Sequence, residues 1–104
     1  MTTSSAGPIA LYGFLTAKPG HADVLRRRLA DLVEPSRGHE GNLQYHLHEQ
    51  SDGRFFLYEQ WRSQADLDRH NATEVLREFL AEAPEHLDGG PEAYFGELLS
   101  SPVG

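Results

Sequence analysis

The stretch from Phe55 to His70, which reads FFLYEQWRSQADLDRH, constrains the fold of this chain more than any other. Its first half is rich in aromatic side chains, has the two-residue period of a β-strand and ends at Trp61. Ser63 then supplies a helix N-cap, and Asp66, three residues later, completes a capping-box pattern. The strand and the helix therefore bring the ring of Trp61 and the imidazole of His70 to the same end of a sheet. We expect a functional site there.

The alternation also gives this strand two different faces. One face carries Phe55, Leu57, Glu59 and Trp61, and the other carries Phe56, Tyr58 and Gln60. Tyr58 is therefore not expected to line the same cavity as Trp61. Glu59 shares a face with Trp61, and on a covered face a carboxylate is paired with a cation or has a raised pKa. We expect pairing, with Arg62 or Arg77.

The remaining pattern predicts a single domain with the element order strand, helix, strand, strand, helix, strand. Strands are expected at residues 9–17, 42–50, 54–61 and 92–99, with a hairpin turn at 51–53. Helices are expected at about 21–34 and 63–83, the second broken near 71–73, with a polar loop at 34–41. This order is that of a ferredoxin-like α+β fold, in which helices cover one face of a four-stranded antiparallel sheet. The domain is expected to span 9–99, between a disordered leader at 1–8 and a tail at 100–104.

Composition excludes several classes of function. The 104-residue chain has a net charge of −7, which argues against binding to nucleic acid. It has no cysteine, which excludes disulfides and thiolate chemistry and fits a reducing cytoplasm. The sequence contains neither a bilayer-spanning stretch nor a signal-peptide pattern, so we expect a cytoplasmic protein with no membrane partner.

The run Phe56-Leu57-Tyr58-Glu59-Gln60-Trp61, followed by Ala65-Asp66-Leu67 and His70, resembles the antibiotic biosynthesis monooxygenase family. The resemblance covers about residues 9–99 and implies a dimeric α/β barrel built from ferredoxin-like protomers. It also implies oxygenation of a phenolic, quinol or polycyclic aromatic substrate by O₂ without flavin, haem or metal. Some similar proteins degrade haem with an asparagine on the first strand. The corresponding strand here, IALYGFLTA, has no asparagine, which disfavours that activity.

The resemblance and the residue types together nominate seven site residues. Trp61 is expected to form a pocket wall and His70 to act as general base or hydrogen-bond donor, since imidazole titrates near neutral pH. Substrate-binding roles are assigned to Tyr12, His46, Asn71, Leu76 and Phe79. The structural alternatives are a core tryptophan, a histidine bonded to backbone, and ordinary packing by the apolar residues. His46 and His48 could also bind a metal, but no third ligand is evident, so we expect none.

Two other functions use the same scaffold. One is a non-catalytic module that holds a hydrophobic ligand, which ligand-induced thermal stabilisation without product would indicate. The other is a polyketide cyclase or isomerase, which would leave the oxygen content of its product unchanged. We favour a cofactor-independent monooxygenase.

The two-faced strands also predict a homodimer. Helices can cover only one sheet face, and the aromatic face that remains is too large to be left in water. The sheet of a second copy, related by a two-fold axis, is the simplest cover. Light scattering at micromolar concentration should therefore give twice the mass of one chain, and a monomeric mass would contradict the prediction.

Overall fold

The computed structural model describes residues 8–51 and 53–100. Its elements are β1 (Ile9–Thr16), α1 (Ala22–Ala30), α2 (Val33–Arg37), β2 (Asn42–Glu49), β3 (Arg54–Trp61), α3 (Gln64–Asn71), α4 (Glu74–Glu82), the 3₁₀-helix η2 (Ala83–Glu85) and β4 (Glu92–Glu97). Most of the predicted leader and tail, and Asp52 of the predicted hairpin turn, lie outside the described residues.

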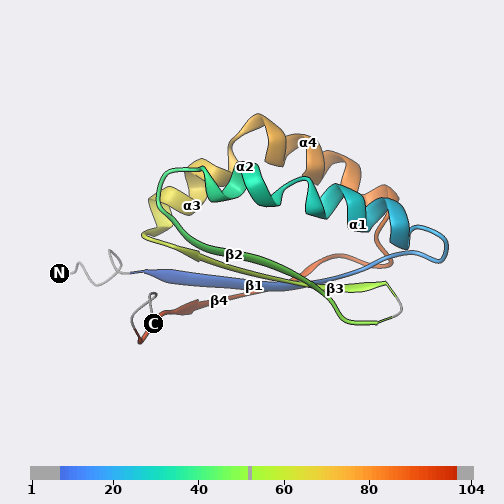
Figure 1. Cartoon of the computed structure of the whole chain (residues 1–104), viewed down its shortest axis with the longest axis horizontal. Helices are drawn as coiled ribbons and strands as arrows, with labels where there is room; N and C mark the ends of the chain where they lie inside the picture. Colours follow the sequence, from blue (N-terminus) through green and yellow to red (C-terminus); the bar gives the residue numbers. More distant parts are fainter. Residues whose placement is uncertain (1–7, 52, 101–104) are drawn as a thin grey trace.

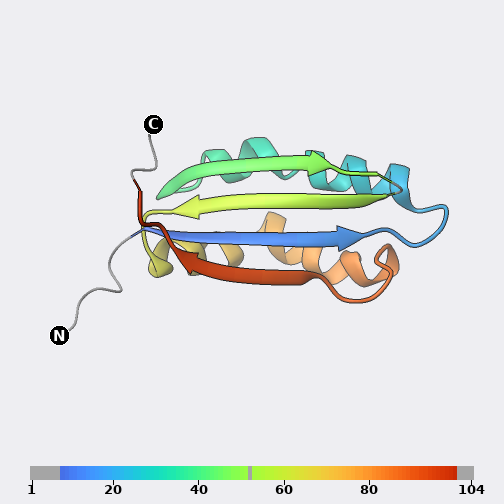
Figure 2. The same cartoon turned by 90° about the horizontal axis from the view of Figure 1, so that it is seen from below.

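The four strands form one antiparallel sheet in the order β2-β3-β1-β4. The described helices lie against one face of this sheet, as Figure 1 shows from the side. Figure 2 shows the sheet from below, with β1 and β3 at its centre. The predicted ferredoxin-like α+β fold is confirmed. No helix in the described part of the chain has the length and apolar character needed to cross a bilayer.

The helical region before β2 differs from the prediction. The single helix expected at 21–34 ends at Ala30, and a second short helix, α2, occupies the first half of the predicted loop. Pro35 lies inside α2 instead of ending a helix. It is the third residue of α2, where a backbone N–H has no intrahelical partner, so proline is tolerated. The break predicted near 71–73 is confirmed between α3 and α4.

The side chains of β3 alternate between the two faces of the sheet, as predicted. Phe55 and Trp61 are fully buried beneath the helices and belong to two separate parts of the core. On the opposite face, Phe14 packs on Phe56 with ring centroids 5.2 Å apart. There Gln60 donates a 2.6 Å hydrogen bond to the Tyr58 hydroxyl. The sheet face away from the helices is therefore aromatic.

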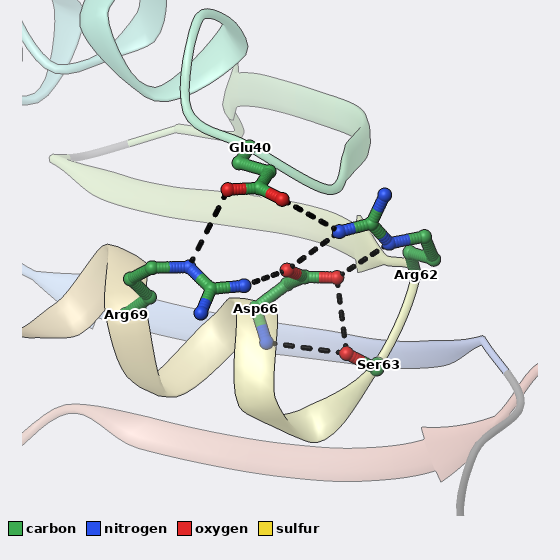
Figure 3. Close-up of polar contacts among 5 residues, drawn as sticks. All are labelled: Glu40, Arg62, Ser63, Asp66 and Arg69. Carbon is green, nitrogen blue, oxygen red and sulfur yellow. Dashed lines mark hydrogen bonds and ion pairs between the residues drawn. The ribbon is translucent and has the colours of Figure 1, made fainter.

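A buried carboxylate, Asp66, joins the start of α3 to the loop before β2 (Figure 3). Arg62 donates two hydrogen bonds to it, of 2.8 and 2.9 Å, and Arg69 donates another. Ser63 caps α3 as predicted, accepting from the Asp66 backbone N–H, and its hydroxyl donates to the Asp66 carboxylate at 3.0 Å. The guanidinium groups hold the pKa of Asp66 at about 2. Glu40, from the loop, forms ion pairs with both arginines at 3.2 and 3.9 Å.

The loop approaches Asp66 so closely that only glycine fits at position 41. Gly41 has a φ of +84°, and a Cβ placed on it would lie 2.2 Å from Asp66 Cγ. The Gly41 carbonyl accepts a 2.8 Å hydrogen bond from the Arg62 backbone N–H. The loop is therefore fastened to the end of β3 by backbone as well as by side chains.

Gly41→Ala should destabilise the fold more than Gly20→Ala, as measured by urea unfolding. Gly20 has the same φ of +84°, but a Cβ added there would meet nothing within 4 Å, so its replacement reports backbone strain alone. We expect about 1 kcal/mol for Gly20→Ala and about 3 kcal/mol for Gly41→Ala, since the second also displaces Asp66. Equal losses would show that the close approach contributes nothing to stability.

Candidate active site

A pocket of about 600 Å³ lies between the helix-covered face of the sheet and the region from α4 to β4. A volume of this size suits a small aromatic molecule. Most of its walls are apolar, including Leu11, Leu15, Leu57, Leu76, Phe79 and Leu80. Gly13 also lines it, and a Cβ there would lie 2.9 Å from the Glu92 carbonyl oxygen, so glycine permits the close approach of β1 and β4.

The structure brings three of the five predicted substrate-binding residues to this pocket. Asn71, Leu76 and Phe79 line it. Tyr12 and His46 do not, because they lie on the opposite face of the sheet, where both pair with Tyr58 across the strands. The structure therefore separates these two residues from the other three.

The predicted catalytic residues lie next to each other but behind the pocket wall. Trp61 and His70 are buried, with ring centroids 4.4 Å apart. Neither lines the pocket. Glu59, which accepts a hydrogen bond from Trp61 and lies 3.8 Å from His70, does line the pocket and is only 4% exposed. Trp61 and His70 can therefore influence a ligand through Glu59.

Among the described residues, no arginine forms an ion pair with Glu59. The expected pairing with Arg62 or Arg77 is wrong, because Arg62 instead binds Asp66 and Glu40 and the Glu59 carboxylate accepts its hydrogen bond from Trp61 Nε1 at 2.9 Å. Burial raises the pKa of Glu59 to about 7, although the Trp61 hydrogen bond acts in the opposite direction. The alternative that the sequence left open, a raised pKa, is what the structure supports. A carboxyl with this pKa can both accept and return a proton at neutral pH.

His70 is held between two titratable side chains. Its Nε2 lies 3.8 Å from Glu59 Oε1, and its Nδ1 lies 2.8 Å from Nδ1 of His39. Burial, with a smaller contribution from His39, lowers the pKa of His70 to about 4. At neutral pH the ring is therefore an uncharged donor and acceptor, and Glu59 is better placed than His70 to take a proton from a ligand.

Sequence reasoning nominated Trp61 and His70 and gave too little weight to Glu59 and His39. A signal for Glu59 was present, because the alternation placed it on the covered face beside Trp61. No local signal identified His39, which lies 31 residues before His70 and meets it only when the loop after α2 folds against α3.

The structure does not assemble a metal site from the histidine pair. Within the described residues, no three His, Asp or Glu side chains come together as possible ligands. His46 is exposed, and its Nε2 lies 2.6 Å from Gln44 Oε1.

Comparison with known proteins identifies close similarity to one family. The family model described as antibiotic biosynthesis monooxygenase matches residues 8–82, which include Glu59, Trp61 and His70. The chain is 32% identical over 92 residues to "Putative monooxygenase YcnE" of Bacillus subtilis, covering 86% of this chain and 97% of that protein. It is also 32% identical over 82 residues to the uncharacterized protein sll1783 of Synechocystis, but there the match spans 77% of this chain and 56% of the other protein.

The fold is also similar to that of a solved structure. PA3566 from Pseudomonas aeruginosa superposes with a TM-score of 0.85 at 36% identity, covering 94% of this chain and all of that one. The resemblance drawn from the sequence motif is thereby confirmed at the level of family and fold.

Replacing Glu59 should change how stability depends on pH. A carboxyl whose pKa rises from 4.5 to about 7 on folding favours the folded state while it is protonated. Its contribution is therefore fully present below about pH 4.5 and is lost as pH rises through about 7. Between these values the wild type should lose up to about 3 kcal/mol of unfolding free energy relative to Glu59→Gln, measured by urea unfolding at a series of pH values.

Glu49→Gln is the matched control. Arg26 binds Glu49 through hydrogen bonds of 2.8 and 2.7 Å and lowers its pKa, so its carboxylate stabilises the fold above the usual pKa and less below it. The pH-dependent difference between wild type and Glu49→Gln should therefore have the opposite sign. A difference between wild type and Glu59→Gln that does not vary with pH would contradict the assignment of a raised pKa to Glu59.

Proposed function

The chain belongs to the antibiotic biosynthesis monooxygenase family, and from this premise we propose that it oxygenates a hydroxylated aromatic, quinol or polyketide-type substrate with O₂ and without a resident cofactor. The observation that carries the proposal is an apolar pocket into which a buried carboxyl with a pKa of about 7 projects. Such a pocket binds an uncharged aromatic ring by burying its surface. The carboxylate can then remove a proton from a hydroxyl or an acidic carbon of the bound molecule.

The first step is removal of a proton. Near pH 7 about half of the Glu59 side chains are carboxylates, as their pKa requires. A Glu59 carboxylate accepts the proton from a phenolic hydroxyl, or from an acidic carbon next to a carbonyl, and an electron-rich anion results. The surrounding apolar wall disfavours a charged product, so delocalisation of the charge over an aromatic system is needed. This requirement favours quinols and anthrones over simple aliphatic alcohols.

The anion then supplies the electrons for reduction of O₂. One electron passes to O₂, the two radicals combine, and a carbon–oxygen bond forms. For an anthrone-type CH₂ group, the carbon loses four electrons in total and becomes a carbonyl. One atom of O₂ is the carbonyl oxygen, and the other leaves as water with two protons, the number that the CH₂ group loses. Glu59, which took the first proton, can exchange it with solvent and supply a proton to the departing oxygen.

Trp61 and His70 support this chemistry from behind the pocket wall. The hydrogen bond from Trp61 Nε1 fixes one oxygen of Glu59 and stabilises its ionised form. The uncharged His70 ring packs on Trp61 and leaves the pKa of Glu59 in the neutral range, where a fixed positive charge would lower it. His70 is thus a positioning residue for Glu59.

The proposal predicts oxygen-dependent turnover that requires Glu59. The purified protein should convert members of a panel of anthrones and hydroquinones in air but not under nitrogen, and mass spectrometry should show oxygen gained. Glu59→Gln should lower kcat/KM by about 10²-fold or more, because the amide cannot accept the proton. His70→Ala should lower it less, because His70 does not take the proton from the substrate.

Glu34→Gln, in an exposed ion pair on α2, is the control and should retain wild-type turnover. Full activity in Glu59→Gln would contradict the proposed role of this residue. Thermal stabilisation by panel members without any product would indicate a binding module, and a product without added oxygen would indicate a cyclase or isomerase.

A further inference from the structure

Three titratable side chains follow one another from the pocket to a hollow between α3 and the loop before β2. Glu59 lines the pocket, His70 lies behind it with 1% of its surface exposed, and His39 lies beyond His70. His39 is only partly buried, and with His70 it lines a separate surface hollow of about 260 Å³. The series therefore begins in the substrate pocket and ends at a different opening to solvent.

The outer end of this series is held in place by backbone and by charge. The His39 N–H donates to the Ser36 carbonyl at 3.1 Å, and its carbonyl accepts from the Asn42 N–H at 3.2 Å. The next residue, Glu40, is tied to Arg62 and Arg69 around Asp66 (Figure 3). These hydrogen bonds and ion pairs hold the loop in one position. They thereby fix the 2.8 Å contact between the Nδ1 atoms of His39 and His70.

We propose that His39 and His70 form a proton relay that connects Glu59 with solvent at the hollow between α3 and the loop before β2. The proposal rests on the proposed function, because it assigns Glu59 a proton to exchange. A substrate that fills the apolar pocket also blocks access of water to Glu59 from the pocket side. The relay supplies a route that stays open while the pocket is occupied.

The contact between the two histidines defines how the proton moves. Two Nδ1 atoms 2.8 Å apart share one proton, so one ring donates and the other accepts. When His70 carries its proton on Nδ1, its Nε2 is free to accept a proton from protonated Glu59. In the same step the Nδ1 proton of His70 passes to His39 Nδ1, and a proton leaves His39 Nε2 for water.

In the net transfer, Glu59 loses one proton and solvent gains one. Both rings end uncharged and in the opposite tautomers. The reverse passage returns a proton to Glu59 and restores the starting tautomers. The 3.8 Å separation of His70 Nε2 from Glu59 Oε1 is longer than a hydrogen bond, so the carboxyl must approach by about 1 Å for transfer.

The groups around His70 favour transfer without a charged intermediate. Glu59 faces it from β3, Tyr45 from β2 with ring centroids 6.0 Å apart, and His39 from the loop, while Glu40 and Arg69 line the outer hollow. Burial keeps the pKa of His70 near 4 and raises that of Tyr45, so both stay uncharged at neutral pH. A relay in which each histidine exchanges one neutral tautomer for the other needs a central imidazole that stays uncharged.

The first test needs no substrate. In protein labelled with ¹⁵N-histidine, NMR should show His70 changing from the Nδ1–H to the Nε2–H tautomer as Glu59 ionises between about pH 6 and pH 8. His39 should change in the complementary sense. Glu59→Gln, which removes the ionising group without touching His39, should abolish the change at both rings. A His39 signal that is the same in wild type and Glu59→Gln would overturn the relay.

The second test uses turnover of an anthrone by the whole protein. His39→Ala should lower kcat by about tenfold, and added imidazole should restore it by entering the hollow. His39→Gln should be equally slow, because an amide can hydrogen bond to His70 but cannot pass a proton through. Failure of imidazole to restore His39→Ala, or full activity in His39→Gln, would overturn the relay.

His21→Ala is the matched control. His21 contacts His86 through Nδ1 atoms 3.1 Å apart, and neither residue lines the pocket. This variant should keep wild-type turnover and show no effect of imidazole. If the wild type turns over no panel member, the proposed oxygenation fails, and the NMR test still decides the relay.

Discussion

The carboxylate of Asp66 is the interaction on which the arrangement of this site depends. It receives hydrogen bonds from Arg62 and Ser63, which join β3 to α3, and from Arg69 of α3. Glu40 extends the same network to the loop before β2. Because a carboxylate buried this deeply is stable only when its partners surround it, the three segments must meet in one geometry. That geometry sets Trp61, His70 and His39 beside one another.

Two buried carboxyl groups close together in the chain behave in opposite ways because of what surrounds them. Asp66 is enclosed by guanidinium groups, and its pKa falls to about 2. Glu59 is enclosed by apolar atoms and the Trp61 indole, and its pKa rises to about 7. The cations taken up by Asp66 are therefore unavailable to Glu59. The same network that fastens the loop leaves the pocket carboxyl without a positive partner.

The alternation of β3 lets one short strand serve two surfaces. Its odd-numbered residues build the core and the pocket wall, and its even-numbered residues build an aromatic face on the other side of the sheet. A shift of register by one residue would exchange the two sets. The site and the proposed dimer surface therefore depend on a single register, which is set by eight consecutive pairs with β1.

The sequence by itself determined the element order, the parity of β3 and the N-cap of α3, because hydrophobic period and capping chemistry are local properties of the chain. Helical spacing also indicated the covered face of α4, which carries Leu76 and Phe79. The sequence did not predict α2, because a proline in a polar stretch indicates a loop as readily as the first turn of a helix. The tertiary structure alone decided which partners the charged groups take. Arg62 could reach either Glu59 or Asp66 in sequence, and the fold directs it to Asp66. His39 contacts His70, 31 residues later in the chain. This contact forms only in the tertiary structure, so no local sequence pattern predicts it.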